Sequence, residues 1–122
     1  MAERSPEAED HYFVALDAFS EGSLDQAVAS YKQALALDPT YTDAMHGLSR
    51  ALQDLGRFDE AIEVSKRIAE LDPEDILAYT SLSILYQHKG MVPEAEEWST
   101  KAKLLGWKKE LKEKKEASQQ RS

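Results

Sequence analysis

Small and apolar residues recur every three or four positions along two consecutive segments in the middle of the chain. The first segment carries Ala44, Leu48, Ala51, Leu52 and Leu55, and the second carries Phe58, Ala61, Ile62, Ser65, Ile68 and Leu71. This spacing predicts two amphipathic helices. Gly56 is expected to end the first because glycine tolerates a left-handed cap, and Pro73 to end the second because proline lacks the helical N–H. No segment alternates apolar and polar residues as a strand does, so an all-α fold is predicted.

The same two-helix pattern recurs with a period of 34 residues. The period is shared by three glycines (Gly22, Gly56 and Gly90), by three alanines (Ala27, Ala61 and Ala95) and by two Leu-Asp-Pro sequences that end at Pro39 and Pro73. It predicts three helical hairpins over residues 8–41, 42–75 and 76–109, within a single domain over 1–122. Since one hairpin cannot bury its apolar face alone, the three are expected to stack into a solenoid.

Small side chains mark where the two helices of each hairpin should meet. Ala27, Ala61 and Ala95 fall on the second helices, and Ala15, Ser49 and Ser83 fall on the first helices with the same period. Small residues on both sides let paired helices approach closely. In the first helix, Val14, Ala15 and Ala18 are expected to face this interface.

These residues resemble the tetratricopeptide repeat (TPR) family, whose period is also 34 residues. The repeated glycines and alanines, together with Tyr31, Ala34, Pro39 and Pro73, occupy positions that the family favours. The resemblance implies a right-handed α-solenoid that binds other proteins. The sequence departs from the family at His11, Met45 and Tyr79, at Ser65 and Ser99, and at Trp107 in place of proline. The last departure indicates that no fourth repeat follows the third.

The C-terminal segment is expected to form a separate helix that caps the solenoid. Gly106 is predicted to break the preceding helix, and the new helix would run from Trp107 to about Gln119. Trp107 and Leu111, four residues apart, would pack on the third repeat while the lysines face water. The alternative is a basic arm for nucleic acid or anionic lipid, which the interleaved glutamates Glu110, Glu113 and Glu116 weaken.

Charge separates the chain into two parts. The 122 residues have a net charge of -8, but residues 1–100 carry 7 Lys and Arg against 20 Asp and Glu, while residues 101–122 carry 8 against 3. Residues 1–100 should repel nucleic acid and anionic membranes, whereas residues 101–122 could attract either of them. Because Met1–Glu7 has no apolar run and no stretch approaches a membrane span of about 20 apolar residues, a cytoplasmic protein without membrane insertion is expected.

No catalytic or metal-binding pattern is evident, so no enzyme activity and no cofactor are predicted. The chain has no cysteine, which excludes disulfides and thiolate metal sites. The histidines His11, His46 and His88 lack the spacing of metal ligands. Glu94, Glu96 and Glu97 lie early in a predicted helix, where they complement its dipole.

The TPR resemblance also implies a concave groove lined by the first helix of each repeat. Transferred residue by residue, the groove positions are Glu9, Tyr12, Leu16, Phe19 and Ser20, then Asp43, His46, Arg50, Gln53 and Asp54, then Leu77, Thr80, Ile84, Gln87 and His88. Helical spacing independently places Tyr12, Leu16 and Phe19 on one stripe. This stripe is either a binding patch or a surface covered by the N-terminal segment or by a second copy.

Chaperone-binding members of the family hold a peptide's C-terminal carboxylate with Lys, Asn and Arg. The corresponding positions here are Tyr12, Leu16, Gly47, Leu77 and Ser81, none of which supplies such a side chain. A carboxylate clamp for Glu-Glu-Val-Asp tails is therefore not expected. Arg50 is the one cation at the groove positions, and Asp43 and Asp54 are expected to neutralise it. The chain is predicted to be a protein-binding adaptor. The alternatives are a self-associating scaffold module and an RNA or membrane-surface binder that acts through the tail.

Overall fold

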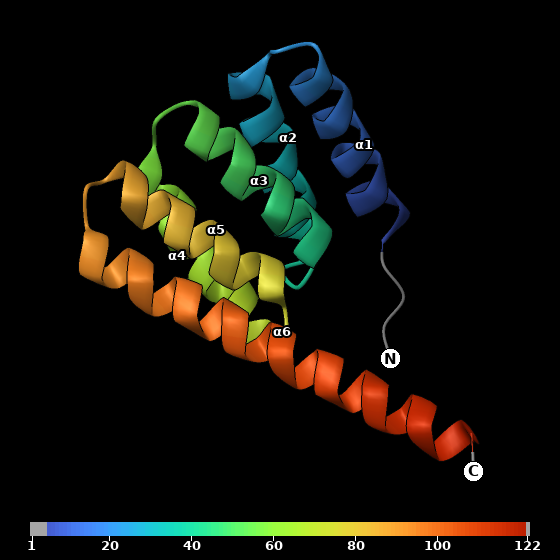
Figure 1. Ribbon diagram of the computed structural model, residues 1–122. Helices are drawn as coiled ribbons and strands as arrows, with labels where there is room; N and C mark the ends of the chain where they lie inside the picture. The colour runs from blue at the N-terminus through green and yellow to red at the C-terminus, as the bar shows by residue number, and fades with distance from the viewer. Residues whose placement is uncertain (1–4, 122) are drawn as a thin grey trace.

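The computed structural model describes residues 5–121, which form six α-helices and no strand (Figure 1). The helices are α1 (Pro6–Ser20), α2 (Leu24–Leu37), α3 (Thr42–Asp54), α4 (Phe58–Leu71), α5 (Ile76–His88) and α6 (Val92–Arg121). Each helix packs on the next in the chain, so three antiparallel hairpins stack side by side. The predicted all-α solenoid is confirmed.

Three glycines end the first helix of each hairpin, as their period predicts. Gly22, Gly56 and Gly90 have φ angles of 81°, 79° and 74°, in the left-handed region that side chains with a Cβ rarely adopt. Ser5 and Asp75 cap the other ends of α1 and α5, where their side chains accept hydrogen bonds from the N–H groups of Ala8 and Ala78. Local chemistry therefore sets the hairpin geometry.

The small residues lie at the contacts within the hairpins, as expected. Ala27, Ala61 and Ala95 are all buried. The Ser49 hydroxyl donates to the Ala61 carbonyl (3.3 Å), and the Ser83 hydroxyl donates to the Ala95 carbonyl (2.8 Å). These hydrogen bonds satisfy buried hydroxyls and hold the helix pairs of the second and third hairpins at close range.

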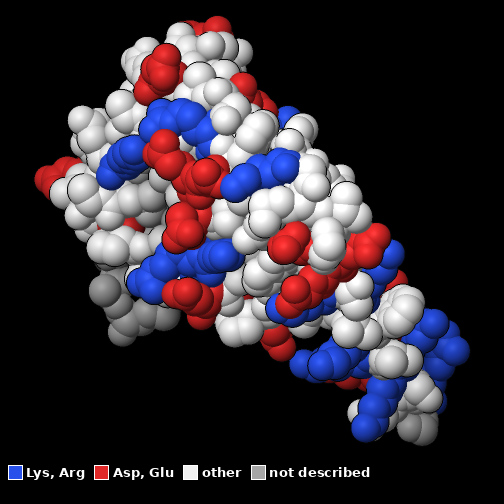
Figure 2. Space-filling view, turned by 90° about the vertical axis from the view of Figure 1, so that its left-hand side faces the viewer, with Lys and Arg blue, Asp and Glu red and all other residues white. Residues whose placement is uncertain are grey.

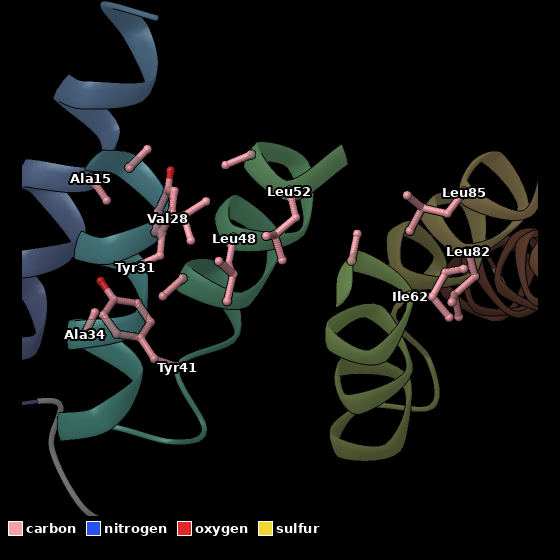
Figure 3. Close-up of a cluster of buried hydrophobic side chains, with 14 of the residues drawn as sticks. Ala15, Val28, Tyr31, Ala34, Tyr41, Leu48, Leu52, Ile62, Leu82 and Leu85 are labelled. Carbon is pink, nitrogen blue, oxygen red and sulfur yellow. The ribbon is translucent and has the colours of Figure 1, made fainter. Parts of the chain in front are cut away.

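Larger side chains fill the space between hairpins (Figure 3). Tyr31 of α2 is 1% exposed, and a Cβ placed on Gly47 of α3 would lie 2.3 Å from the Tyr31 Cζ atom. Gly47 therefore leaves room for the Tyr31 ring. The neighbouring contacts are made by Leu48, Leu52, Ile62, Leu82 and Leu85, all buried.

One residue of α1 is placed differently from the prediction. Ala15 and Ala18 are buried at the hairpin interface, but Val14 is 47% exposed. Its counterparts in the next two repeats, Leu48 and Leu82, are buried. These counterparts lie on helices that follow another hairpin, whereas α1 is the first described helix of the stack.

The predicted capping helix does not exist as a separate element. Helix α6 runs without a break from Val92 through Gly106 to Arg121. A glycine inside a helix costs only about 1 kcal/mol relative to alanine, and nothing packs against this position to turn the chain. Trp107 and Leu111 are 61% and 66% exposed, so they do not cover the third repeat. We call the exposed end of α6, residues 107–121, the tail.

Candidate groove and its relatives

The hairpins bring two of the three predicted groove segments together. A hollow of about 200 Å³, here called the α3–α5 hollow, opens between these two helices. It is lined by His46, Arg50, Gln53, Leu77, Thr80 and Ile84, all predicted groove residues, together with Ser49 and Ser81. Leu77 and Ile84 are 58% and 38% exposed, which leaves apolar surface at this hollow in contact with water.

A second hollow, the α5–α6 hollow, measures about 400 Å³ and continues the first along α5. Thr80 and Ile84 line both hollows, and Gln87 joins them in the second. The residues that sequence reasoning missed are Ile76 and Ser83 of α5 and Ser99, Ala102 and Lys103 of α6. They were missed because the family resemblance places only the first helix of each repeat on the groove.

The α5–α6 hollow corresponds to a space that is filled one repeat earlier. Ser65 and Ile68 of α4 are buried, and α4 packs on α5. Their counterparts 34 residues later, Ser99 and Ala102, are only half-buried. The departure at Trp107, where the family favours proline, was the sequence signal that could have revealed this uncovered face.

A third hollow of about 400 Å³, the tail hollow, adjoins the second through their shared residue Ile76. Its lining is strongly charged and consists of Glu74, Leu105, Lys108, Lys109, Lys112, Glu113 and Glu116 in addition to Ile76. The groove is thus lined by both apolar and uncharged polar side chains at α3 and α5, and by many lysines along α6. Figure 2 shows lysines gathered on the protruding end of the molecule, while acidic and basic side chains intermix over the rest of that face.

His46 is tied to the neighbouring hairpin. Its Nε2 atom lies 2.8 Å from the Asp75 Oδ2 atom, and both side chains are mostly buried. Asp75 also caps α5 by accepting a hydrogen bond from the Ala78 N–H at 3.3 Å. His46 therefore links α3 to the start of α5 and fixes one wall of the α3–α5 hollow.

Arg50 is paired within its own helix. The Arg50 Nε atom donates to the Asp54 Oδ1 atom at 3.2 Å on the exposed side of α3. The expected neutralisation of Arg50 is thus made by Asp54. The pair is exposed, so it contributes little to stability and Arg50 stays accessible to a ligand at the hollow.

The predicted apolar stripe on α1 is largely covered by other residues of the same chain. Tyr12 and Phe19 are half-buried against the core. The Tyr12 ring centroid lies 5.0 Å from that of Tyr41 and 6.1 Å from that of Tyr31. Leu16 remains exposed. The sequence interpretation, in which the N-terminal segment or a second copy covers this stripe, overlooked Tyr41; residues 1–4 lie outside the described part.

The remaining predicted residues do not line the hollows in the part of the chain that the structure describes. The His88 ring stacks on Phe58, with centroids 5.1 Å apart and planes 4° apart. This contact joins α4 to the end of α5. Glu9 is half-buried on α1, and Asp43 is exposed at the start of α3.

Over residues 5–121, no group of three or more His, Asp or Glu side chains is placed to hold a metal ion. None of the described helices is both long and apolar enough to cross a membrane.

Comparison with known proteins assigns the family. The family model described as tetratricopeptide repeat matches residues 18–83. The uncharacterized protein MJ0572 of Methanocaldococcus jannaschii is 33% identical over 63 residues, which are 52% of this chain and 73% of that protein.

Solved structures show the same fold. A crystal structure of MamA matches with a TM-score of 0.82 and 30% identity, over 84% of this chain but only 60% of the MamA chain. The second TPR of Spaghetti (RPAP3), solved bound to the HSP90 peptide SRMEEVD, matches with a TM-score of 0.76 and 19% identity over 82% of this chain and 93% of that one. With the family match over residues 18–83, the chain belongs to the tetratricopeptide repeat family.

Proposed function

We propose that this chain is an adaptor that binds a segment of a partner protein in the groove along α3, α5 and α6. The observation that carries the proposal is the exposure of Leu77 and Ile84 at the α3–α5 hollow. Exposed apolar side chains that line a hollow are typical of protein-binding sites. Membership of the TPR family supports a role in protein–protein interaction and no enzymatic role.

The lining favours a particular kind of segment. A bulky apolar side chain of the partner would contact Leu77 and Ile84, and the amides of Gln53 and Gln87 would hydrogen-bond the partner's backbone. Lys103 in the α5–α6 hollow would attract an acidic residue further along the same segment. Both an extended peptide and a helix meet these requirements.

We further propose that the groove does not use a carboxylate clamp. Of the five clamp positions, Leu16 and Leu77 present apolar surface, and Tyr12 packs against Tyr41. The accessible cation of the α3–α5 hollow, Arg50, donates to Asp54. A terminal carboxylate here would therefore lack the convergent charged donors that hold it in a clamp.

The experiment selects ligands from a random peptide library displayed on phage and measures their affinity by fluorescence anisotropy. The double variant Leu77→Ser/Ile84→Ser should weaken binding by about 100-fold or more, because apolar anchors at the centre of an interface contribute about 2 kcal/mol each. Leu37→Ser is the control, because it also removes an exposed apolar side chain but lies outside the hollows. It should leave the affinity unchanged. Selected peptides that bind the double variant and the parent chain equally would refute the groove as the site.

A further inference from the structure

The outward side of α1 has the position of an inter-repeat contact, but no helix among residues 5–121 packs on it. This face, here called the α1 edge, consists of Asp10, Phe13, Val14 and Asp17, spaced along one side of the helix. Phe13 and Val14 are 55% and 47% exposed. The counterparts one repeat later include Ala44, Leu48 and Ala51, which are buried where α3 packs on α2.

The α1 edge differs from those counterparts in charge. Asp10 and Asp17 stand where the second repeat has Ala44 and Ala51, and no lysine or arginine occurs in α1. An apolar helix packed here would strip water from two carboxylates without compensating them. A helix that covers Phe13 and Val14 must therefore bring positive charge with it.

The α6 helix presents a complementary surface at the other end of the molecule. Leu104, Trp107 and Leu111 follow the i, i+3, i+7 spacing of one helical stripe, and all three are exposed. Helical geometry places Lys108 and Lys115 along one side of this stripe. Lys114 flanks its other side.

The stripe faces away from the body of the molecule. On the opposite side of α6, Lys109, Glu113 and Glu116 line the tail hollow. Lys108 and Lys112 lie between that side and the stripe and line the edge of the same hollow. Every residue of the tail is exposed, and the helix projects past the hairpins (Figure 1). Because α6 is one unbroken helix, the tail cannot fold back onto α1 of its own chain.

We propose that the exposed stripe of α6 in one copy of this chain packs on the α1 edge of a second copy. Phe13 and Val14 would contact Leu104, Trp107 and Leu111, and the flanking lysines would pair with Asp10 and Asp17. The stripe and the edge match in length, since each spans seven residue steps, or about 10 Å of helix. Residues 1–100 carry a net negative charge and residues 101–122 a net positive charge. This difference also favours the approach of α6 of one copy to α1 of another.

A second copy accounts for both surfaces, whereas an anionic lipid surface or a nucleic acid would engage the tail and leave Phe13 and Val14 in water. The contact is heterologous, since two different surfaces meet. Two copies that exchange tails close into a dimer, and copies that do not exchange form a longer chain. Leu77 and Ile84 take no part in this contact, so it is separate from the proposed apolar anchor of ligand binding.

The experiment measures mass in solution by light scattering after gel filtration, over a range of concentrations and at low salt. The parent chain should exceed the single-chain mass of 13.7 kDa, and higher salt should shift it toward that mass. Trp107→Ser/Leu111→Ser and, separately, Asp10→Lys/Asp17→Lys should both give single chains. Circular dichroism confirms that each variant is folded.

A charge exchange distinguishes a specific contact from general attraction. Asp10→Lys/Asp17→Lys combined in one chain with Lys108→Glu/Lys115→Glu should restore the assembly, because the pairing is complementary again. Lys109→Glu, a charge reversal on the other side of α6, should not restore it. A parent chain that is monomeric at every concentration overturns the proposal. Asp10→Lys/Asp17→Lys chains that have the same mass as an assembled parent chain also overturn it. Tail-dependent cosedimentation of such a monomer with phosphatidylserine vesicles would assign the stripe to lipid instead.

Discussion

Gly47 and Gly106 are both helical glycines, but their surroundings are opposite. A Cβ on Gly47 would lie 2.3 to 2.6 Å from three atoms of the buried Tyr31 ring. Gly47→Ala should therefore lower the free energy of unfolding by about 1 to 3 kcal/mol, the usual range for overpacking a core. Urea unfolding followed by circular dichroism measures this loss. Unchanged stability would mean that the α2–α3 contact is looser than described.

Gly106→Ala is the matched control, because a Cβ at this position meets nothing within 4 Å. Alanine should stabilise the helix locally by about 0.5 to 1 kcal/mol. The expected result is two- to five-fold slower amide hydrogen exchange in the tail, measured by NMR. Faster exchange would indicate that Gly106 ends the helix, as the sequence alone predicts.

Tyr31 should make the fold sensitive to alkali. Burial raises the pKa of the Tyr31 phenol above its ordinary value of 10.0, and the nearby Tyr12 raises it further. The unfolded chain therefore loses this proton at lower pH than the folded chain, so the stability is complete below pH 10 and falls as pH rises beyond it. Tyr31→Phe should flatten this fall in pH-dependent urea unfolding; an equally steep fall in the variant would contradict the assignment.

At the scale of elements, the helices were predictable wherever the chain has to reverse. Gly22, Gly56 and Gly90 share both a period and a left-handed backbone, because each precedes a helix that packs back on the one before it. Gly106 lies outside that period, and no helix packs back after it. The predicted break failed because glycine permits a turn, while only a packing partner makes the turn favourable.

The groove was predictable in its middle and not at its ends. The family resemblance placed six residues that do line the α3–α5 hollow. Tyr12 was misplaced because its ring packs on Tyr41, a contact between a helix and a distant loop residue that no local pattern encodes. Lys103 was missed because it lies on a second helix, and the family resemblance places only the first helix of each repeat on the groove.

Removing the tail tests its role as an element. If the tail capped the third repeat, truncation after Gly106 would expose apolar core and destabilise the fold by several kcal/mol. Because every tail residue is exposed, the free energy of unfolding of the truncated chain should instead lie within about 0.5 kcal/mol of that of the parent chain. Urea unfolding of dilute protein, where self-association is negligible, gives the comparison. A large loss would restore the capping interpretation.

At the scale of the whole molecule, the groove and the edges should act independently. Leu77 and Ile84 lie on α5, whereas the α1 edge and the exposed stripe of α6 belong to the two ends of the stack. Leu77→Ser/Ile84→Ser should weaken peptide binding by about 100-fold or more without changing the mass in solution. Trp107→Ser/Leu111→Ser should lower the mass to that of a single chain without changing peptide affinity. Combining all four substitutions should give additive effects, measured by anisotropy and light scattering. Strong coupling would place both functions on one surface.

The uninterrupted course of α6 also gives the molecule a lever. Its 30 residues span about 45 Å, and only the first half is anchored in the third hairpin. Any group attached near Arg121 therefore turns with that hairpin instead of diffusing on a loose tether. Gly106, the glycine inside α6, has the most flexible backbone in the helix. Its rigidity therefore determines how far the C-terminal end of α6 can move relative to the third hairpin.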